Sequence, residues 1–156
     1  MVNYRFVTTW RLRAPIDAVW EALADAERWP EWWGGVVSVT PLKTGDAGGV
    51  GAASRYVWRS KLPYSLAFDV EVVRVEPPTL VEGRASGELE GSGIWRLSQD
   101  GDTTTAEYTW AVRTASRWMN LLAPIARPAF AWNHDYVMAR GAEGLARFLN
   151  AELVVK

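Results

Sequence analysis

The amino-acid sequence predicts an α+β fold in which a strongly twisted antiparallel sheet of about seven strands wraps around one long C-terminal helix. Three observations support this prediction. Apolar and polar residues alternate in several segments before residue 115, as they do in half-buried strands. After Ser116 the apolar spacing becomes helical, and no proline interrupts it from residue 129 onward. The chain also contains ten tryptophans, which suit the wall of an apolar cavity between the sheet and the helix.

The N-terminal elements are a strand and two short helices. Residues 3–13 alternate, with mainly apolar side chains on one face and arginines on the other, which predicts a strand. Pro15 is compatible with the start of a helix, and apolar residues then recur at helical spacing to about Ala24. Residues 25–35 are rich in tryptophan and end in two glycines, which predicts a second short helix.

The other strands follow one another along the chain and form a meander. We expect them at residues 36–43, 52–59, 66–72, 80–90, 91–99 and 103–114. The turn signals between them are the loop Gly45–Gly51, Pro63, Pro77-Pro78 and Asp100-Gly101. Strands that are joined by short connections in this way pair with their neighbours in the sequence, so the meander is antiparallel.

The C-terminal helix is expected to begin after Pro128, because Pro124 and Pro128 interrupt the helical spacing before it, and to end near residue 152. Its length of about 36 Å exceeds the radius of gyration of about 15 Å for a domain of this size, so it must cross the whole molecule. Its apolar stripe comprises Phe130, His134, Val137, Met138, Gly141, Leu145, Phe148 and Leu149. A single helix cannot fill the concave face of a twisted sheet, which predicts the cavity.

Composition restricts the function. The chain carries 17 basic and 18 acidic residues, for a net charge of −1, and no basic block for nucleic acid. It has one histidine and no cysteine, so we expect no disulfide, no thiol chemistry and no metal site. The first residues lack the charged-then-apolar layout of a signal peptide, so we expect none, and we find no linker and no apolar run of the roughly 20 residues that span a membrane. We therefore expect one cytoplasmic domain over residues 1–156, without a cofactor or stable membrane insertion.

Segments spread over nearly the whole chain carry a family resemblance. They are Ala14–Trp20, Trp29–Trp33, Gly45–Gly51, Ala85–Gly91, Trp132–Met138 and Gly144-Leu145. Together they resemble the SRPBCC superfamily, and in particular its polyketide cyclase/dehydrase-like branch. The resemblance implies the helix-grip fold of START lipid-transfer domains and pollen allergens, and the binding of an apolar molecule such as a lipid, hormone or polyketide. It also implies that the loop Gly45–Gly51 lies at the cavity mouth.

His134 is the candidate catalytic residue. It lies on the apolar stripe of the long helix, and an imidazole titrates near neutral pH. Two interpretations stay open: a general acid or base that points into the cavity, or a structural histidine that is hydrogen-bonded to a neighbour. Asn133 points elsewhere on the helix, and we assign it a structural role.

Three tyrosines, Tyr56, Tyr64 and Tyr108, fall on or near inward strand faces. A phenol beside a substrate carbonyl could stabilise a developing enolate. The alternative is packing with one satisfied hydroxyl.

The strand expected at residues 80–90 has two contrasting faces. Glu82 and Arg84 either orient a ligand inside the cavity or form a solvated pair on the convex face. The opposite face carries Val81, Gly83 and Ala85, small residues that would leave room inside.

The side chains expected to bind the ligand are apolar or aromatic groups on inward faces. They are Trp29, Trp33, Tyr56, Trp58, Tyr64, Phe68, Val70, Trp95, Tyr108, Trp110, Trp118, Phe130 and Met138. Two functions stay open: a polyketide cyclase, aromatase or dehydratase that uses His134 and a tyrosine, and a non-catalytic carrier of a lipid or another apolar ligand. In both, the partner is a hydrophobic small molecule, and the protein is a monomer or a homodimer.

Overall fold

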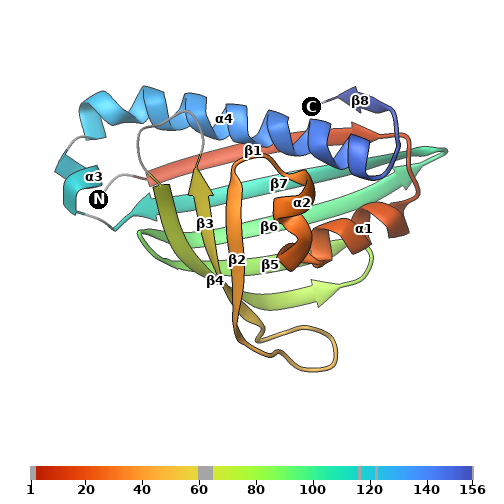
Figure 1. The fold of residues 1–156 in the computed structure, drawn as a ribbon, viewed down its shortest axis with the longest axis horizontal. Helices are drawn as coiled ribbons and strands as arrows, with labels where there is room; N and C mark the ends of the chain where they lie inside the picture. The colour runs from red at the N-terminus through yellow and green to blue at the C-terminus, as the bar shows by residue number, and fades with distance from the viewer. Residues whose placement is uncertain (1–2, 60–64, 116, 122, 156) are drawn as a thin grey trace.

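The computed structural model describes residues 3–59, 65–115, 117–121 and 123–155 of the chain. One antiparallel sheet of eight strands forms the body of the molecule (Figure 1). The strands are β1 (Asn3–Leu12), β2 (Val36–Lys43), β3 (Ala53–Arg59), β4 (Ser65–Glu76), β5 (Leu80–Gly87), β6 (Leu89–Asp100), β7 (Thr103–Thr114) and β8 (Leu153–Val155). The helices are α1 (Ile16–Ala24), the 3-10 helix η1 (Ala26–Arg28), α2 (Trp29–Trp32), α3 (Arg117–Leu121) and α4 (Ala123–Phe148).

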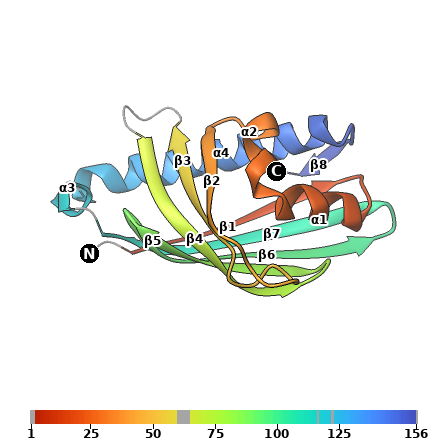
Figure 2. The same ribbon diagram turned by 60° about the horizontal axis from the view of Figure 1, so that its bottom comes forward.

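The sheet curves around the helices. Its strand order is β2-β3-β4-β5-β6-β7-β1-β8, so the meander from β2 to β7 pairs in sequence order and β1 closes onto β7. Helices α1, α2 and α4 lie on the same side of the sheet, and α4 runs along most of the molecule (Figures 1 and 2). The predicted α+β helix-grip arrangement is therefore confirmed.

The strand number is corrected from about seven to eight, because β8 was not predicted. Three residues are too few to show alternation, and the expected helix extended to about residue 152. Instead, α4 ends at Phe148. Asn150 takes a left-handed conformation with φ 52°, and the Ala151 amide donates to the Ala146 carbonyl at 2.8 Å. This Schellman cap turns the chain back toward β1, with which β8 pairs.

The start of α4 was predicted too late. The helix begins at Ala123, and Pro128 lies inside it. A proline in a helix removes the hydrogen bond from its own missing N–H, and its ring crowds the carbonyl group four residues earlier. So close to the start of a 26-residue helix, this loss is tolerated.

The second short helix is less regular than expected. Residues 25–35 contain η1 and α2, and Trp33 already has extended backbone angles (φ −100°, ψ 101°). Pro30 lies in the first turn of α2, where its fixed φ is favourable. Gly35, with φ 107°, then makes the turn into β2.

Two glycines let α4 approach this segment closely. A Cβ atom on Gly144 would lie 1.7 Å from the carbonyl oxygen of Trp32, and one on Gly141 would lie 2.5 Å from the Trp33 ring. The Trp33 indole N–H also donates to the carbonyl oxygen of Val137 at 2.9 Å. The two close approaches are possible only because glycine has no side chain. Together with the hydrogen bond, they hold α2 against α4.

Four buried tryptophan rings pack together where α2, α4 and β1 meet. We call the rings of Trp10, Trp29, Trp32 and Trp33 the indole cluster; all four are buried. Ring centroids lie 5.2 Å apart for Trp10 and Trp33 and 4.9 Å apart for Trp29 and Trp33. The indole cluster fills this end of the concave face with aromatic side chains, and two of its rings, Trp29 and Trp33, also border the cavity described below. Among the described residues, no helix is long and apolar enough to cross a membrane.

Candidate functional site

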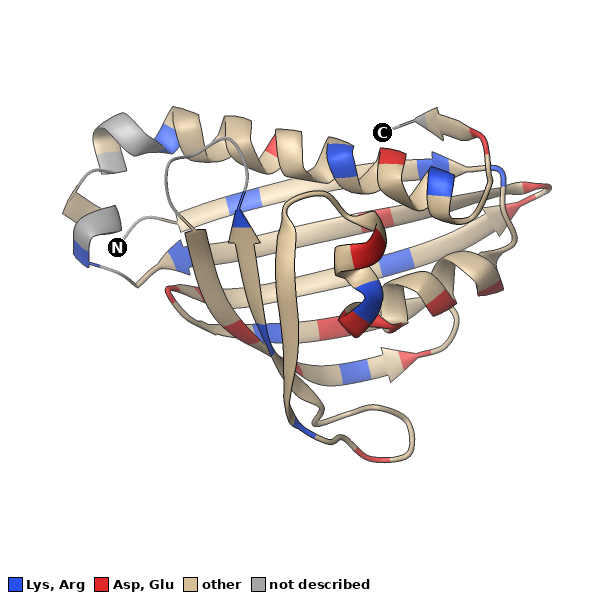
Figure 3. Cartoon of the chain, in the orientation of Figure 1, with Lys and Arg blue, Asp and Glu red and all other residues tan. Residues whose placement is uncertain are grey.

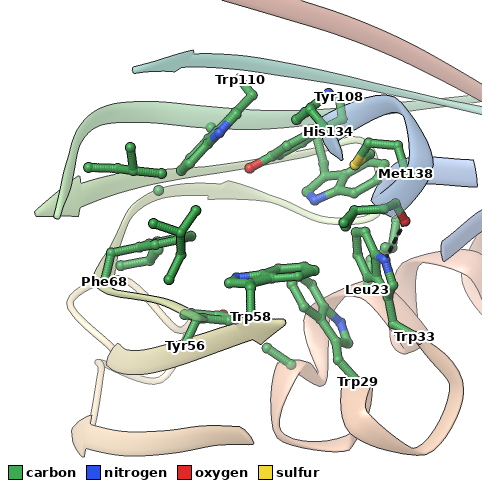
Figure 4. Close-up of a pocket in the computed structure, with 18 of the residues that line it drawn as sticks. Leu23, Trp29, Trp33, Tyr56, Trp58, Phe68, Tyr108, Trp110, His134 and Met138 are labelled. Carbon is green, nitrogen blue, oxygen red and sulfur yellow. Dashed lines mark hydrogen bonds between the residues drawn. The ribbon is translucent and has the colours of Figure 1, made fainter. Parts of the chain in front are cut away.

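A cavity of about 190 Å³ lies between α4 and the concave face of the sheet. Its wall is built from strands β3 to β7, from α4 and from the segment α1–α2 (Figure 4). The inward alternation of the strands aims their aromatic side chains at this space. The cavity therefore begins where the indole cluster ends.

Every predicted site residue whose side chain the structure describes lies in this wall. They are Trp29, Trp33, Tyr56, Trp58, Phe68, Val70, Trp95, Tyr108, Trp110, Phe130, His134 and Met138. Tyr64 lies outside the described residues, and so does the side chain of Trp118.

Sequence reasoning did not include several other wall residues among the expected ligand-binding side chains. They are Leu23, Ala24, Ala26, Leu66, Val72, Leu89, Gly93, Asn133 and Val137. The alternation of β4 points Leu66 and Val72 inward, and this signal could have identified them. Asn133, which we expected to point elsewhere, lines the cavity beside His134.

A pair of glycines forms the floor of the cavity. Gly83 of β5 and Gly93 of β6 are direct cross-strand partners, and both line the cavity. A Cβ atom on Gly83 would lie 2.5 Å from a methyl group of Val70, and one on Gly93 would lie 2.3 Å from the Tyr108 hydroxyl. The side chains of Val70 and Tyr108 thus lie over the two glycines, close to the sheet, so that space remains above them.

The Tyr56 and Tyr108 phenols bring polar groups into this apolar wall. Among the described residues neither hydroxyl has a hydrogen-bond partner. Burial raises the pKa of both phenols well above the ordinary value, and the nearby Tyr56 raises that of Tyr108 further. Both therefore stay neutral at pH 7 and can donate a hydrogen bond.

His134 has no partner for its ring nitrogens among the described residues. The imidazole stacks on Phe6 of β1, with ring centroids 4.1 Å apart and an angle of 15°. Both nitrogens are sealed from solvent and unpaired, and Nδ1 lies 3.9 Å from the exposed Asp135 carboxylate. Burial lowers the pKa of His134 to about 4. The ring is therefore neutral at pH 7, with one N–H and one lone pair that no described residue satisfies.

Figure 3 shows the positions of the charged residues along the chain, and none of those that the structure describes is buried. No aspartate, glutamate, lysine or arginine is among the described residues that line the cavity. Glu82 and Arg84 alternate with the inward Val81 and Gly83, which places them on the convex face. Across the described part of the chain, no group of three His, Cys, Asp or Glu residues could hold a metal ion.

The loop Gly45–Gly51 does not line the cavity. The carboxylate of Asp46 accepts hydrogen bonds from the amides of Gly48 and Val50, at 2.9 and 3.0 Å, which holds the loop in a local turn. The Gly51 amide donates to the carbonyl of Val72, a wall residue, and the position of the loop at the cavity mouth stays a prediction.

The curved sheet, the long helix and the apolar cavity between them define the class: this is a helix-grip protein. The family model described as "Polyketide cyclase / dehydrase and lipid transport" matches residues 4–150. The chain belongs to this family of the SRPBCC superfamily, and the resemblance seen in the sequence is confirmed. A comparison with curated proteins found no match.

Solved structures of low sequence identity share the fold. A START superfamily protein from Mycobacterium smegmatis is 13% identical with a TM-score of 0.76, over 94% of this chain and 97% of that one. A protein from Thermus thermophilus is 15% identical with a TM-score of 0.74, over 92% and 98%. An aromatase/cyclase from a Streptomyces species, strain R1128, is 17% identical with a TM-score of 0.63, over 90% and 94%. At such identities the likeness shows the fold alone.

Proposed function

We propose that the protein binds a small aromatic or otherwise apolar molecule in this cavity. The proposal is carried by one observation, a hollow of about 190 Å³ whose apolar wall includes the rings of five tryptophans, two tyrosines and two phenylalanines. An apolar cavity of about 150 Å³ accepts benzene, whereas drug-sized ligands occupy about 300 Å³ or more. A ligand of one or two rings therefore suits this space better than a long lipid or an extended polyketide.

The walls offer affinity through burial and ring stacking. Phe68 lies 6.3 Å from Tyr56 and 5.5 Å from Trp110 between ring centroids, so rings from three strands surround one space. Apolar surface removed from water contributes about 25 cal/mol per Å², and each aromatic pair adds about 0.5–1.5 kcal/mol. Since the sheet and α4 share this one core, we also propose that residues 1–156 act as a single domain.

Isothermal titration calorimetry with toluene and naphthalene tests the binding proposal. Val81 lines the cavity, so Val81→Phe fills it and should abolish binding of both rings. Val7 is 51% exposed, so the matched variant Val7→Phe should bind like the wild type. A wild-type protein that binds neither ring, or a Val81→Phe protein that binds both unchanged, would refute the proposal.

Ring closure of a small polyketide-like substrate is a second candidate function, and the unpaired His134 imidazole favours it. A buried polar group without a partner in a native fold calls for an explanation, and catalysis is one. One similar structure is an aromatase/cyclase. Because both ring nitrogens are sealed, the substrate must bind together with a rotation of the ring.

The chemistry would be an aldol-type step. The neutral imidazole takes a proton from a carbon between two carbonyl groups, and the Tyr108 hydroxyl donates a hydrogen bond to the enolate oxygen. The enolate carbon attacks a second carbonyl carbon, and the imidazolium returns the proton to the new alkoxide oxygen.

Product analysis by mass spectrometry with a short poly-β-ketone tests this second candidate. His134→Ala should lower turnover at least about tenfold. Affinity for toluene should change little, because His134 contributes only part of the apolar wall. An unchanged rate, or no turnover by the wild type, would reject catalysis by His134 and favour a carrier.

A further inference from the structure

We infer that the ligand is a neutral planar ring with one hydrogen-bonding substituent, and that Tyr108 anchors this substituent from a position set by Gly93. The inference rests on the proposed binding function and gives it a chemical class of ligand and two specificity-determining residues.

The position of the Tyr108 phenol depends on a missing side chain. Tyr108 pairs with Trp95, whereas Gly93 pairs with Trp110, so the phenol reaches across to the next inward position on β6. A Cβ atom on Gly93 would lie 2.3 Å from the Tyr108 hydroxyl and 3.0 Å from the Trp110 ring. Any other residue at position 93 would therefore push the hydroxyl away from the floor.

The Tyr108 hydroxyl is the polar group best placed to meet a ligand. It points toward the space between the labelled side chains in Figure 4. Neither tyrosine hydroxyl is sealed from solvent, unlike the His134 nitrogens, and the Tyr108 side chain is the less buried of the two. A ligand hydroxyl or carbonyl is the partner that this hydroxyl lacks among the described residues.

The wall selects against charge. Because the described wall residues include no cationic or anionic side chain, an ionised ligand would lose its hydration without gaining a counter-ion. The flat faces of Trp58, Phe68 and Trp110 favour a planar ring in the same space.

Two ligands of the same shape separate the hydrogen bond from packing. Calorimetry compares p-cresol with p-xylene, which has a methyl group in place of the hydroxyl, on wild type and Tyr108→Phe. We expect Tyr108→Phe to weaken p-cresol about threefold to tenfold and to leave p-xylene unchanged. Benzoate should bind neither protein.

The positioning role of Gly93 is tested against its cross-strand partner. Gly93→Ala should weaken p-cresol selectively and should cause no further selective loss in a Tyr108→Phe background, where the clashing oxygen is absent. Gly83→Ala, whose Cβ atom would meet Val70, should weaken p-cresol and p-xylene by the same factor.

Several outcomes would overturn the inference. They are an equal effect of Tyr108→Phe on both ligands, selective loss of p-cresol in Tyr56→Phe rather than Tyr108→Phe, and benzoate as the tightest ligand. If Gly93→Ala fails to fold, the Tyr108→Phe comparison still decides the anchor. A wild-type protein that binds neither p-cresol nor p-xylene would instead remove the proposed function, and this inference with it.

Discussion

The two ends of the concave face use glycine in opposite ways. At the indole cluster, Gly141 and Gly144 of α4 are covered by groups from another element, the segment that carries α2, and the core is solid. Over the sheet, Gly83 and Gly93 are covered by side chains of the sheet itself, and a hollow remains above them. A glycine therefore allows two elements to pack closely when a group from the other element occupies the space of its missing Cβ atom. It helps to leave a cavity when a side chain from its own sheet occupies that space.

The largest loss of stability is expected from a substitution in the close contact between α2 and α4. Gly144→Ala places a Cβ atom 1.7 Å from the backbone carbonyl of Trp32, which cannot move alone. We expect a loss of about 3 kcal/mol or more in the free energy of unfolding, measured with urea. Gly48→Ala is the control, because its nearest contact would be 3.5 Å in an exposed loop. Equal stabilities of the two variants would show that α2 and α4 are not tightly joined.

The hollow end should be sensitive to acid. The folded-state pKa of His134 is about 4, against about 6.5 in an unfolded chain. Between these values the unfolded state binds more protons than the folded state. The contribution of neutral His134 to the free energy of unfolding is therefore complete above about pH 6.5 and is lost as the pH falls to about 4. The loss amounts to about 3 kcal/mol.

His134→Leu is the comparison for this acid sensitivity, because it lacks the titrating group and keeps the carboxylates. Unfolding free energies measured at pH 7 and pH 4 should fall less in the variant than in the wild type. Parallel losses in the two proteins would mean that His134 is accessible to protons in the folded state.

In the indole cluster, the N–H of Trp33 has a hydrogen-bond partner, whereas those of Trp10 and Trp32 have none among the described residues. The Trp33 N–H donates to the Val137 carbonyl, one turn beyond His134 on α4, and Trp33 is 2% exposed. Trp33→Phe removes this hydrogen bond and leaves a void, for an expected loss of about 2 kcal/mol. Trp132→Phe, at a ring that is 53% exposed, should change stability by less than about 0.5 kcal/mol. If chemical denaturation shows similar losses of unfolding free energy for Trp33→Phe and Trp132→Phe, the Trp33 hydrogen bond and packing do not stabilise this end of the core.

The smallest effect is expected where space is already present. Val81→Phe enters the cavity and should alter the unfolding free energy by less than about 1 kcal/mol. Val19 is fully buried outside the cavity wall, and Val19→Phe should cost about 1–3 kcal/mol through overpacking. If thermal unfolding shows the same loss for both, the hollow is filled in solution.

Much of the wall could be predicted because strand alternation is local. Period two in β3, β4 and β7 was enough to place Tyr56, Phe68 and Tyr108 on the inward face. Helical spacing did the same for Phe130 and Met138 on α4. Each of these assignments needs only the periodicity of its own element.

The features that were missed depend on contacts between distant segments. Gly93 gives no signal of its own, because its role appears only when Tyr108 of the next strand lies across it. β8 is too short for a period, and it forms because Asn150 reverses the chain after α4. Sequence periodicity predicts which face a side chain takes, whereas cavity volume depends on how the elements pack together.

The indole cluster also has an optical consequence. Ring centroids only 4.9–5.2 Å apart bring the electronic transitions of Trp10, Trp29 and Trp33 into strong dipole coupling. The folded protein should then show exciton-split bands in circular dichroism. Light absorbed in the interior will migrate among the rings, two of which, Trp29 and Trp33, border the hollow. A guest that accepts this energy would dim the emission of the whole set, so the molecule carries its own spectroscopic reporter of occupancy.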